Sequence, residues 1–346
     1  MFVLTLISLV SSKICPIYQC STPIQNISNA QCIEKNGFTY FLGTCSEEYY
    51  SYCPPNESDS FCQLPLTPSD INISYIGEPC VYDRNCYKSL CTDKICTGFT
   101  LNSTCSYTAQ CNVGTYCFNS TCQALQSLNG VCKSDYDCMN NLGCYYSTCV
   151  QYFSLKEGEI LESCEGGFNY LCASGACGIA SNETMFCLGN YKSVNLTPAI
   201  CSNDGDCLMN QTLVPEGYSS GCQCGYNEFG LSYCGLSPGD SDYQTFISLM
   251  KEWVAGSNIK KCHTYSRTNL KCINQFAKNS LAVELTYRYL LVTNYSQVQG
   301  NDECVKEIFT SQFWTAQSAY KNLPKEKDDD SMGAVLKVGI LLLGLF

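Results

Sequence analysis

Cysteine is the residue type whose number and spacing offer the most chemistry in this chain. The sequence has 346 residues, and 30 of them are cysteine. Thiols at this density either coordinate metal, as in arrays of zinc modules, or pair as disulfides in an oxidising compartment. The sequence has one histidine and lacks the tight CxxC knuckles that zinc modules use. We therefore predict disulfides, with no metal-ligating residue and no cofactor.

Few other residues could support catalysis. A Ser-His-Asp or Cys-His arrangement would have to use His263, which follows Cys262, a cysteine that we expect to be oxidised. The chain has no P-loop and no Rossmann glycine pattern. The acidic stretches 203–206 and 239–242 could contribute to calcium binding, but they lack the remaining ligands of an EF-hand loop, so turn residues are favoured. Paired carboxylates, as in glycosidases, would need a cleft that small repeats do not offer. The sequence predicts no catalytic residues, and hence a protein that is not an enzyme.

The cysteines are spaced as a tandem repeat. In residues 80–96 successive cysteines are separated by five, four and four residues. In residues 105–122 and again in 132–149 the separations are five, five and four. Looser copies follow in residues 164–187 and 201–234. We therefore predict five small cysteine-rich units in succession, built from short β-hairpins and irregular turns.

Disulfides must stabilise these units, because about 25 residues cannot bury a hydrophobic core of useful size. Four cysteines allow three pairings, and the spacing does not choose among them. We favour the pairing of first with third and second with fourth cysteine, which makes each unit an interlocked knot. For the two most regular units this predicts the bonds Cys105–Cys117, Cys111–Cys122, Cys132–Cys144 and Cys138–Cys149.

The repeat carries a resemblance to known proteins. The segment Cys105-Ser-Tyr-Thr-Ala-Gln-Cys111-Asn-Val-Gly-Thr-Tyr-Cys117-Phe-Asn-Ser-Thr-Cys122 resembles the cysteine-rich repeats of Dickkopf-type N-terminal regions, which are also abundant in surface proteins of ciliated protists. The segment Cys234-Gly-Leu-Ser-Pro-Gly-Asp240, with Cys262-His263 and Cys272 after it, is similar to the C-terminal part of those protist proteins. The resemblance covers about residues 75–275 and implies a fold style and a location, not a reaction. Wnt antagonism does not follow, because no second cysteine-rich domain of the Dickkopf type is recognisable.

The N-terminal region predicts entry into the secretory pathway. Residues 1–12 are mostly apolar, too short to span a bilayer, and end in a plausible signal-peptidase site, so we predict a signal peptide rather than a buried strand. Residues 13–63 contain six cysteines with long separations and are expected to form a separate N-terminal cap. Residues 64–79 are expected to be a linker.

The C-terminal region predicts a lipid anchor. A polar stalk, residues 323–331, precedes an apolar tail, residues 332–346, that is too short for a permanent membrane span. Small residues followed by such a tail match the signal that is replaced by glycosylphosphatidylinositol (GPI). We choose Ser331 as the attachment site, with Asp329 and Asp330 as rivals. The alternative is a C-terminal helix packed in a globular core.

Glycosylation sequons and charge agree with a surface location. Nine N-x-S/T sequons predict exposed, glycosylated positions in a secreted protein. They are at Asn26, Asn56, Asn72, Asn102, Asn119, Asn182, Asn195, Asn210 and Asn294. The formal net charge of -11 excludes an electrostatic nucleic-acid partner and requires that any membrane attachment be hydrophobic or covalent.

Residues 241–322 are poorer in cysteine and show helical periodicity. Three apolar stripes predict a small helical domain, although the second stripe, from Leu270, leads into residues 287–292, which read equally as a strand. The stripes begin at Phe246, Leu270 and Val305, and the third stops before Pro324. We interpret the aromatic side chains as an ordinary core rather than a partner-binding groove. Five cysteines in 201–234 and three in 262–304 predict at least one disulfide between the last repeat and the helical domain.

The sequence thus predicts an elongated array of small disulfide-rich repeats followed by a small α-helical domain. The favoured function is a non-enzymatic coat or adhesion protein, anchored by a glycolipid to the extracellular face of the plasma membrane, with the repeats as a stiff spacer. The alternative is a receptor or lectin-like module whose N-terminal cap binds an extracellular protein or glycan. A protease inhibitor would need a rigid reactive loop, and none is recognisable.

Overall fold

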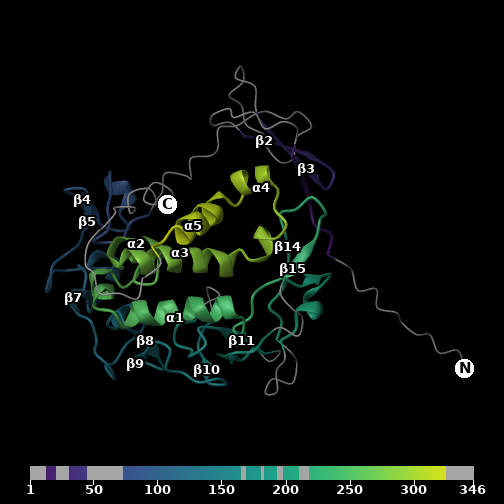
Figure 1. Ribbon diagram of the computed structural model, residues 1–346. Coiled ribbons are helices and arrows are strands. Elements are labelled where there is room, and N and C mark those ends of the chain that lie inside the picture. Colours follow the sequence, from purple (N-terminus) through teal and green to yellow (C-terminus); the bar gives the residue numbers. More distant parts are fainter. Residues whose placement is uncertain are drawn as a thin grey trace, which may run out of the picture. The chain divides into compact units, whose positions relative to one another are not determined.

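A computed structural model describes residues 13–20, 31–44, 73–164, 169–180, 183–192, 198–209 and 218–324 (Figure 1). The chain divides into two compact units. The first unit comprises Met1–Pro65, Tyr191–Asp240 and Leu291–Ser311, and the second comprises Leu66–Asn190, Ser241–Leu290 and Gln312–Phe346. Both units are therefore assembled from segments far apart in the sequence, and the segment 241–322 contributes to both.

Three successive repeats of the second unit share one plan. A single 3-10 turn lies between the first and second cysteines, and a two-stranded antiparallel hairpin carries the third and fourth. The 3-10 turns are η1 (Asp83–Asn85), η2 (Thr108–Gln110) and η3 (Asp135–Asp137). The hairpins are β4 (Leu90–Thr92) with β5 (Ile95–Thr97), β6 (Thr115–Phe118) with β7 (Thr121–Ala124), and β8 (Leu142–Tyr145) with β9 (Thr148–Gln151). The third and fourth cysteines face each other across each hairpin.

Each hairpin closes with two residues of positive φ. In β6–β7 these are Asn119 and Ser120, with φ of 48° and 59°, and in β8–β9 they are Tyr146 and Ser147, with φ of 44° and 61°. Two consecutive left-handed residues define the turn whose twist matches that of the flanking strands. The repeats therefore build tight hairpins without the Asn-Gly pair that usually predicts one.

The two looser repeats form three-stranded sheets. The fourth repeat, in the second unit, consists of β10 (Ile160–Leu161), β11 (Cys177–Ile179) and β12 (Met185–Cys187), in the order β10-β12-β11. The fifth repeat, in the first unit, has the 3-10 turn η4 (Asp204–Cys207) and the strands β13 (Ile200–Cys201), β14 (Cys222–Cys224) and β15 (Ser232–Cys234), in the order β13-β15-β14. The fold class is thus the predicted one of short-strand disulfide units with a helical region.

The helical region contains five α-helices. They are α1 (Ser241–Ala255), α2 (Leu270–Phe276), α3 (Asn279–Thr293), α4 (Glu303–Ile308) and α5 (Ser311–Lys321). Two further 3-10 helices are η5 (Ser257–Lys261) and η6 (Ser296–Val298). The predicted stripe of α1 is buried at Phe246, Met250, Trp253 and Val254, while Leu249 is only partly buried.

The structure settles two details that the helical prediction left open. Residues 287–292 lie inside α3, not in a strand, because a run of Tyr, Leu and Val fits either structure and only its packing decides. The third stripe is not one helix. The chain leaves the helix after α4 at Phe309 and Thr310 and starts again in α5, although the apolar spacing continues across the break.

The repeats of the second unit pack against its helices. Figure 1 shows β4, β5 and β7 to the left of α1 and α2, and β8, β9, β10 and β11 below α1. The approach is closest at Gly175 of the fourth repeat, where an added Cβ would lie 2.2 Å from Cδ1 of Ile247 in α1. The hydroxyl of Tyr243 donates a hydrogen bond of 3.2 Å to the Gly175 carbonyl. Only glycine permits this contact between backbone and helix.

The first unit is organised around its N-terminal strand. β1 (Ile17–Cys20) pairs in parallel with β3 (Thr39–Thr44), which pairs antiparallel with β2 (Gln31–Asn36). The ring of Tyr18 in β1 is buried and lies 5.2 to 5.4 Å from the rings of Tyr40, Tyr226 and Phe309. Residues from three distant segments therefore form one small aromatic core.

Candidate functional site

Thirteen disulfide bonds join described cysteines, and none of the described cysteines is free. The structure pairs Cys105 with Cys117, Cys111 with Cys122, Cys132 with Cys144, and Cys138 with Cys149. The first, fourth and fifth repeats also join first to third and second to fourth cysteine. This is the pairing that we favoured among the three. Disulfides at this density are characteristic of secreted and extracellular proteins.

The predicted disulfide between the last repeat and the helical domain was wrong. Cys224, the fifth cysteine of the last repeat, pairs with Cys15. Cys304 of α4 pairs with Cys20, and Cys262 pairs with Cys272. The prediction assumed that the N-terminal cysteines pair among themselves. Strand β1 instead supplies two cysteines to other segments of the first unit.

Polar side chains at two fixed positions hold the first, second, third and fifth repeats. The residue before the second cysteine accepts backbone N–H bonds from the two residues after the first cysteine, so Asp137 accepts from Lys133 and Ser134 at 2.8 and 3.2 Å. Asn85, Gln110 and Asp206 make the equivalent pairs of bonds. These bonds supply partners for backbone donors at the start of the 3-10 turn, as caps do in helices.

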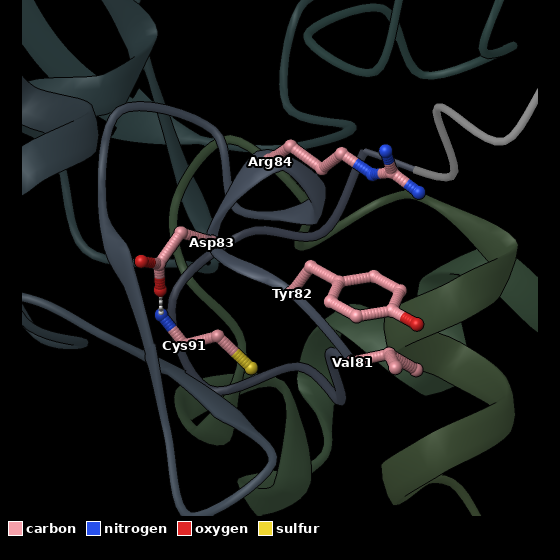
Figure 2. A pocket seen from close by; sticks show the side chains of 5 residues that line it. All are labelled: Val81, Tyr82, Asp83, Arg84 and Cys91. Carbon is pink, nitrogen blue, oxygen red and sulfur yellow. Dashed lines mark hydrogen bonds between the residues drawn. The ribbon is translucent and has the colours of Figure 1, made fainter.

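A second side-chain oxygen reaches the hairpin. Asp83 accepts a hydrogen bond of 2.8 Å from the backbone N–H of the third cysteine, Cys91 (Figure 2). Thr108, Asp135 and Asp204 make the equivalent bond in the second, third and fifth repeats, at 3.2, 2.7 and 2.7 Å. The oxygens of the 203–206 stretch are thus engaged with backbone amides, and Asp240 accepts from the N–H of Ser237 at 2.7 Å. Residues 203–206 therefore act as turn residues, as does Asp240, whereas Asp242 lies in the first turn of α1 and pairs with Arg288.

The hollow drawn in Figure 2 is shallow. It is lined by Val81, Tyr82, Asp83, Arg84 and Cys91 of the first repeat. Tyr82 and Val81 are largely exposed, and Asp83, which is also exposed, uses its carboxylate to accept the N–H of Cys91. The hollow therefore belongs to the architecture of the repeat.

A row of mostly buried polar residues, which we did not predict, lies between the helices and the repeats of the second unit. His263, Arg267 and Lys271 are four residues apart, and they contact the second repeat, the third repeat and the segment that precedes the first repeat, respectively. The sequence carries one signal for these contacts, because the three residues follow one another at intervals of four from the end of the first apolar stripe into the second. We call residues 259–275 the polar seam.

His263 is 1% exposed and both of its ring nitrogens are engaged. The backbone N–H of Tyr265 donates to Nδ1 at 3.3 Å, so Nε2 carries the proton and donates to the Cys111 carbonyl at 3.2 Å. The rings of Tyr75 and Tyr265 stack on the imidazole. Burial, together with the smaller effect of the nearby charge of Arg267, lowers the pKa of His263 to about 4. The histidine is therefore neutral at pH 7.

Arg267 is 2% exposed and fastens the third repeat. Its Nη1 donates to the carbonyls of Cys138 and Met139 at 3.1 and 3.2 Å, and its Nη2 donates to the carbonyl of Asp135 at 2.8 Å and to the Tyr152 hydroxyl. A planar guanidinium can bond to several carbonyls at once because it presents several N–H donors in a fixed geometry. The Trp253 indole donates to the Arg267 carbonyl at 2.7 Å, which links this contact to α1.

Residues 74–78, part of the stretch that we expected to be a linker, bond to the backbone of the first repeat and are held by Lys271 and Gln275 of α2. Lys271 donates to the Ser74 hydroxyl at 2.6 Å and lies 3.8 Å from Glu78, while Gln275 donates to the Gly77 carbonyl at 3.1 Å. Glu78 is 1% exposed, and burial raises its pKa despite the opposing effects of the Tyr75 N–H and Lys271. The contacts of the polar seam therefore extend over the second and third repeats and the segment that precedes the first repeat.

A side chain of the third repeat also donates hydrogen bonds to the polar seam. The amide of Asn140, which is buried, donates to the carbonyls of Ile259 and Cys262, the latter at 2.8 Å. These carbonyls belong to the end of η5, where helix carbonyls lack intrahelical partners. Side chains of the polar seam thus donate to carbonyls of the repeats, and a side chain of the third repeat donates to carbonyls of the polar seam.

Three of the predicted glycosylation sites lie in described residues. Asn102 and Asn119 are exposed and Asn294 is partly exposed. Asn26, Asn56, Asn72, Asn182, Asn195 and Asn210 lie outside the described residues, as do the signal peptide and the anchor candidates Asp329, Asp330 and Ser331. Among the helices that the structure describes, none has the length and apolarity needed to cross a membrane.

Comparison with protein-family models, curated proteins and solved structures finds no match to this chain. The resemblance of the repeats to Dickkopf-type and protist surface proteins therefore stays a prediction.

Proposed function

We propose that this protein is a non-enzymatic coat or adhesion protein of the cell surface, anchored by a glycolipid. The observation that carries the proposal is the pair of interlocked disulfide bonds, first to third and second to fourth cysteine, that recurs in the repeats. Five units use one pairing, and each of the first three has a core made mostly of its own cystines. Units closed in this way keep their shape where reducing agents are absent and where proteases are present.

The single histidine supports a non-enzymatic role. His263 is buried, and both of its nitrogens bond to backbone atoms of the fold. A general base must come within hydrogen-bond reach of the proton that it removes. His263 serves instead to hold the second repeat to the helices.

The attachment to the membrane is supported by the sequence of the C-terminal tail. The test is treatment of intact cells with phosphatidylinositol-specific phospholipase C. We expect release of the protein into the medium, and we expect a chain ended after residue 331 to be secreted without treatment. Retention of the full protein on treated cells, together with retention of the truncated chain, would contradict the anchor.

The second candidate is a receptor or lectin-like module that uses the N-terminal cap. It is favoured by the way in which β1 is fixed, with Cys15 and Cys20 each bonded to a distant segment of the first unit. For this reason the cap must be tested in the full protein. Phe38, which is 63% exposed between β2 and β3, offers a probe. If the cap binds a ligand, Phe38→Ala should lower capture of that ligand by the full chain.

A further inference from the structure

Two adjoining cavities lie beside the polar seam in the second unit. The larger has a volume of about 550 Å³ and the smaller about 360 Å³, and they share Asp135, Tyr136, Tyr152 and Tyr170 in their walls. Small-molecule sites commonly have volumes of about 300 to 1,000 Å³. Together they form one groove lined by six tyrosines, which we call the tyrosine groove. The tyrosines are Tyr136, Tyr145, Tyr152, Tyr170, Tyr265 and Tyr289.

The wall of the tyrosine groove is held in place before any ligand arrives. The rings of Tyr136 and Tyr265 stack with their centroids 3.8 Å apart. The Tyr152 hydroxyl bonds to Arg267 and donates to Asp135 at 3.3 Å. Asp135 is itself fixed by the N–H of Cys144, a disulfide-bonded cysteine. A wall fixed in this way loses little conformational freedom when a ligand binds.

The charges around the larger cavity are already neutralised by the fold. Arg267 donates to three backbone carbonyls and to Tyr152, and it lies 3.9 Å from the Asp135 carboxylate. Lys271 is paired with Glu78 and bonded to Ser74. In the larger cavity an anionic ligand would find no uncommitted cation, and a cationic ligand would compete with Arg267 for Asp135. The wall of the smaller cavity adds one exposed residue of each sign, Lys133, whose ammonium lies 5.4 Å over the Phe118 ring, and Glu162.

Uncharged groups remain for recognition. More than a third of the Tyr136 side chain is exposed, which leaves ring surface open to the groove. Thr264 lines the larger cavity and is only 2% exposed, and its buried hydroxyl has no hydrogen-bond partner among the described residues. A buried hydroxyl without a partner is costly and is expected to find one.

From this combination we infer that the tyrosine groove binds a neutral oligosaccharide. A sugar ring presents a C–H face that packs on an aromatic ring, and its hydroxyls both donate and accept hydrogen bonds. Rigid aromatic surface next to uncharged polar groups fits such a ligand better than it fits a strand or a helix of a partner protein, which needs an exposed strand edge or an apolar groove. The inference concerns the second unit and does not depend on the lipid anchor or on the N-terminal cap.

The test uses the full secreted chain on a glycan panel. The panel contains neutral glucose-, mannose-, galactose- and N-acetylglucosamine-based oligosaccharides, with sialylated and sulfated chains beside them. We expect at least one neutral class to bind. Titration calorimetry with that oligosaccharide should show binding at least tenfold weaker for Tyr136→Ala. Thr264→Val, which removes the hydroxyl and conserves shape, should also weaken it.

The matched control is Tyr146→Ala. Tyr146 belongs to the same repeat and is 54% exposed, but it lines neither cavity. We expect it to bind within twofold of the unaltered protein. The inference is overturned if no neutral oligosaccharide binds, if only charged chains bind, or if Tyr136→Ala and Thr264→Val bind as tightly as the control. Loss of binding in Phe38→Ala alone would assign recognition to the N-terminal cap.

Discussion

The repeats and the helices of the second unit are stabilised in different ways, although they belong to one compact unit. The third repeat has a buried cluster of Cys132, Cys138, Cys149 and Leu142. The helices bury large apolar side chains, among them Trp253, Phe246, Met250, Ile273 and Leu285. A repeat therefore depends on covalent closure of short loops, whereas the helices depend on removal of apolar surface from water.

The polar seam joins these two kinds of structure. Its partners on the repeats are mainly backbone carbonyls, such as those of Gly77, Cys111 and Cys138. Backbone carbonyls are present whatever the side chains of a repeat are. One helical segment can therefore recognise repeats whose sequences differ, provided that the cystines hold their backbones in the same conformation.

The largest effect is expected from breaking the helical core. Trp253→Ala removes a 2% exposed indole and its bond to the Arg267 carbonyl, and should lower the free energy of unfolding by about 4 kcal/mol. Denaturant unfolding measures this. Glu252→Ala, at an exposed position of the same helix, is the control and should change stability by less than about 0.5 kcal/mol. Equal effects of the two substitutions would contradict a helical core that depends on apolar burial.

A smaller effect is expected from opening one repeat. Replacing Cys138 and Cys149 together by alanine releases a bond between residues 11 apart, which should cost about 3 kcal/mol on the chain-entropy model. Limited proteolysis should then cut the third repeat first. The neighbouring bond Cys111–Cys122 should persist in a peptide map. Scrambling of bonds in other repeats would show that the units do not close independently.

Lowering the pH should destabilise the polar seam, because it leads to protonation of His263. The unfolded chain protonates this histidine near pH 6.5, whereas the folded chain does so only near pH 4. Stability is therefore complete above about pH 6.5 and is lost as the pH falls toward 4, by up to about 3 kcal/mol. Glu78 acts in the opposite sense, because its raised pKa favours the folded state as the pH falls.

The contribution of His263 is isolated by comparison with His263→Gln. We expect the variant to lose less stability than the unaltered chain between pH 7 and pH 4.5. Denaturant unfolding of each protein at pH 7 and at pH 4.5 gives the loss of stability of each protein between the two pH values. Parallel losses in the two proteins would show that protonation of this histidine does not control the seam.

The smallest effect is expected from removing a side chain that fixes a 3-10 turn. Asp137→Ala leaves the N–H groups of Lys133 and Ser134 without their side-chain acceptor and should cost about 1 to 2 kcal/mol. Asp137→Asn keeps an acceptor oxygen and should cost less. Thermal unfolding of the two variants measures how much stability each one loses. If Asp137→Asn loses at least as much stability as Asp137→Ala, the charge of Asp137, and not the position of its oxygen atoms, matters at this position.

Local features of the fold could be predicted from sequence, because short loops restrict their own geometry. The spacing of Cys105, Cys111, Cys117 and Cys122 indicated the repeat, and the stripe from Phe246 to Val254 indicated α1. The contacts between distant segments could not be predicted. Nothing in the spacing of Cys15 shows that it pairs with a cysteine 209 residues away.

The candidate sites follow the same division. The lone histidine was visible in the sequence, but its role depends on the Cys111 carbonyl, which lies 152 residues away. The tyrosine groove is formed by residues of the third and fourth repeats together with residues 264–271 and Tyr289. Its tyrosines have no common spacing, so only the packing of repeats on helices reveals that they share a wall.

The most direct test of the account is the disulfide map of the mature protein, obtained by proteolysis without reduction and mass spectrometry. We predict first-to-third and second-to-fourth bonds in all five repeats, with Cys15–Cys224 and Cys20–Cys304 fixing the N-terminal strand. Bonds between neighbouring cysteines within a repeat, a large number of free thiols, or stoichiometric bound zinc would contradict it.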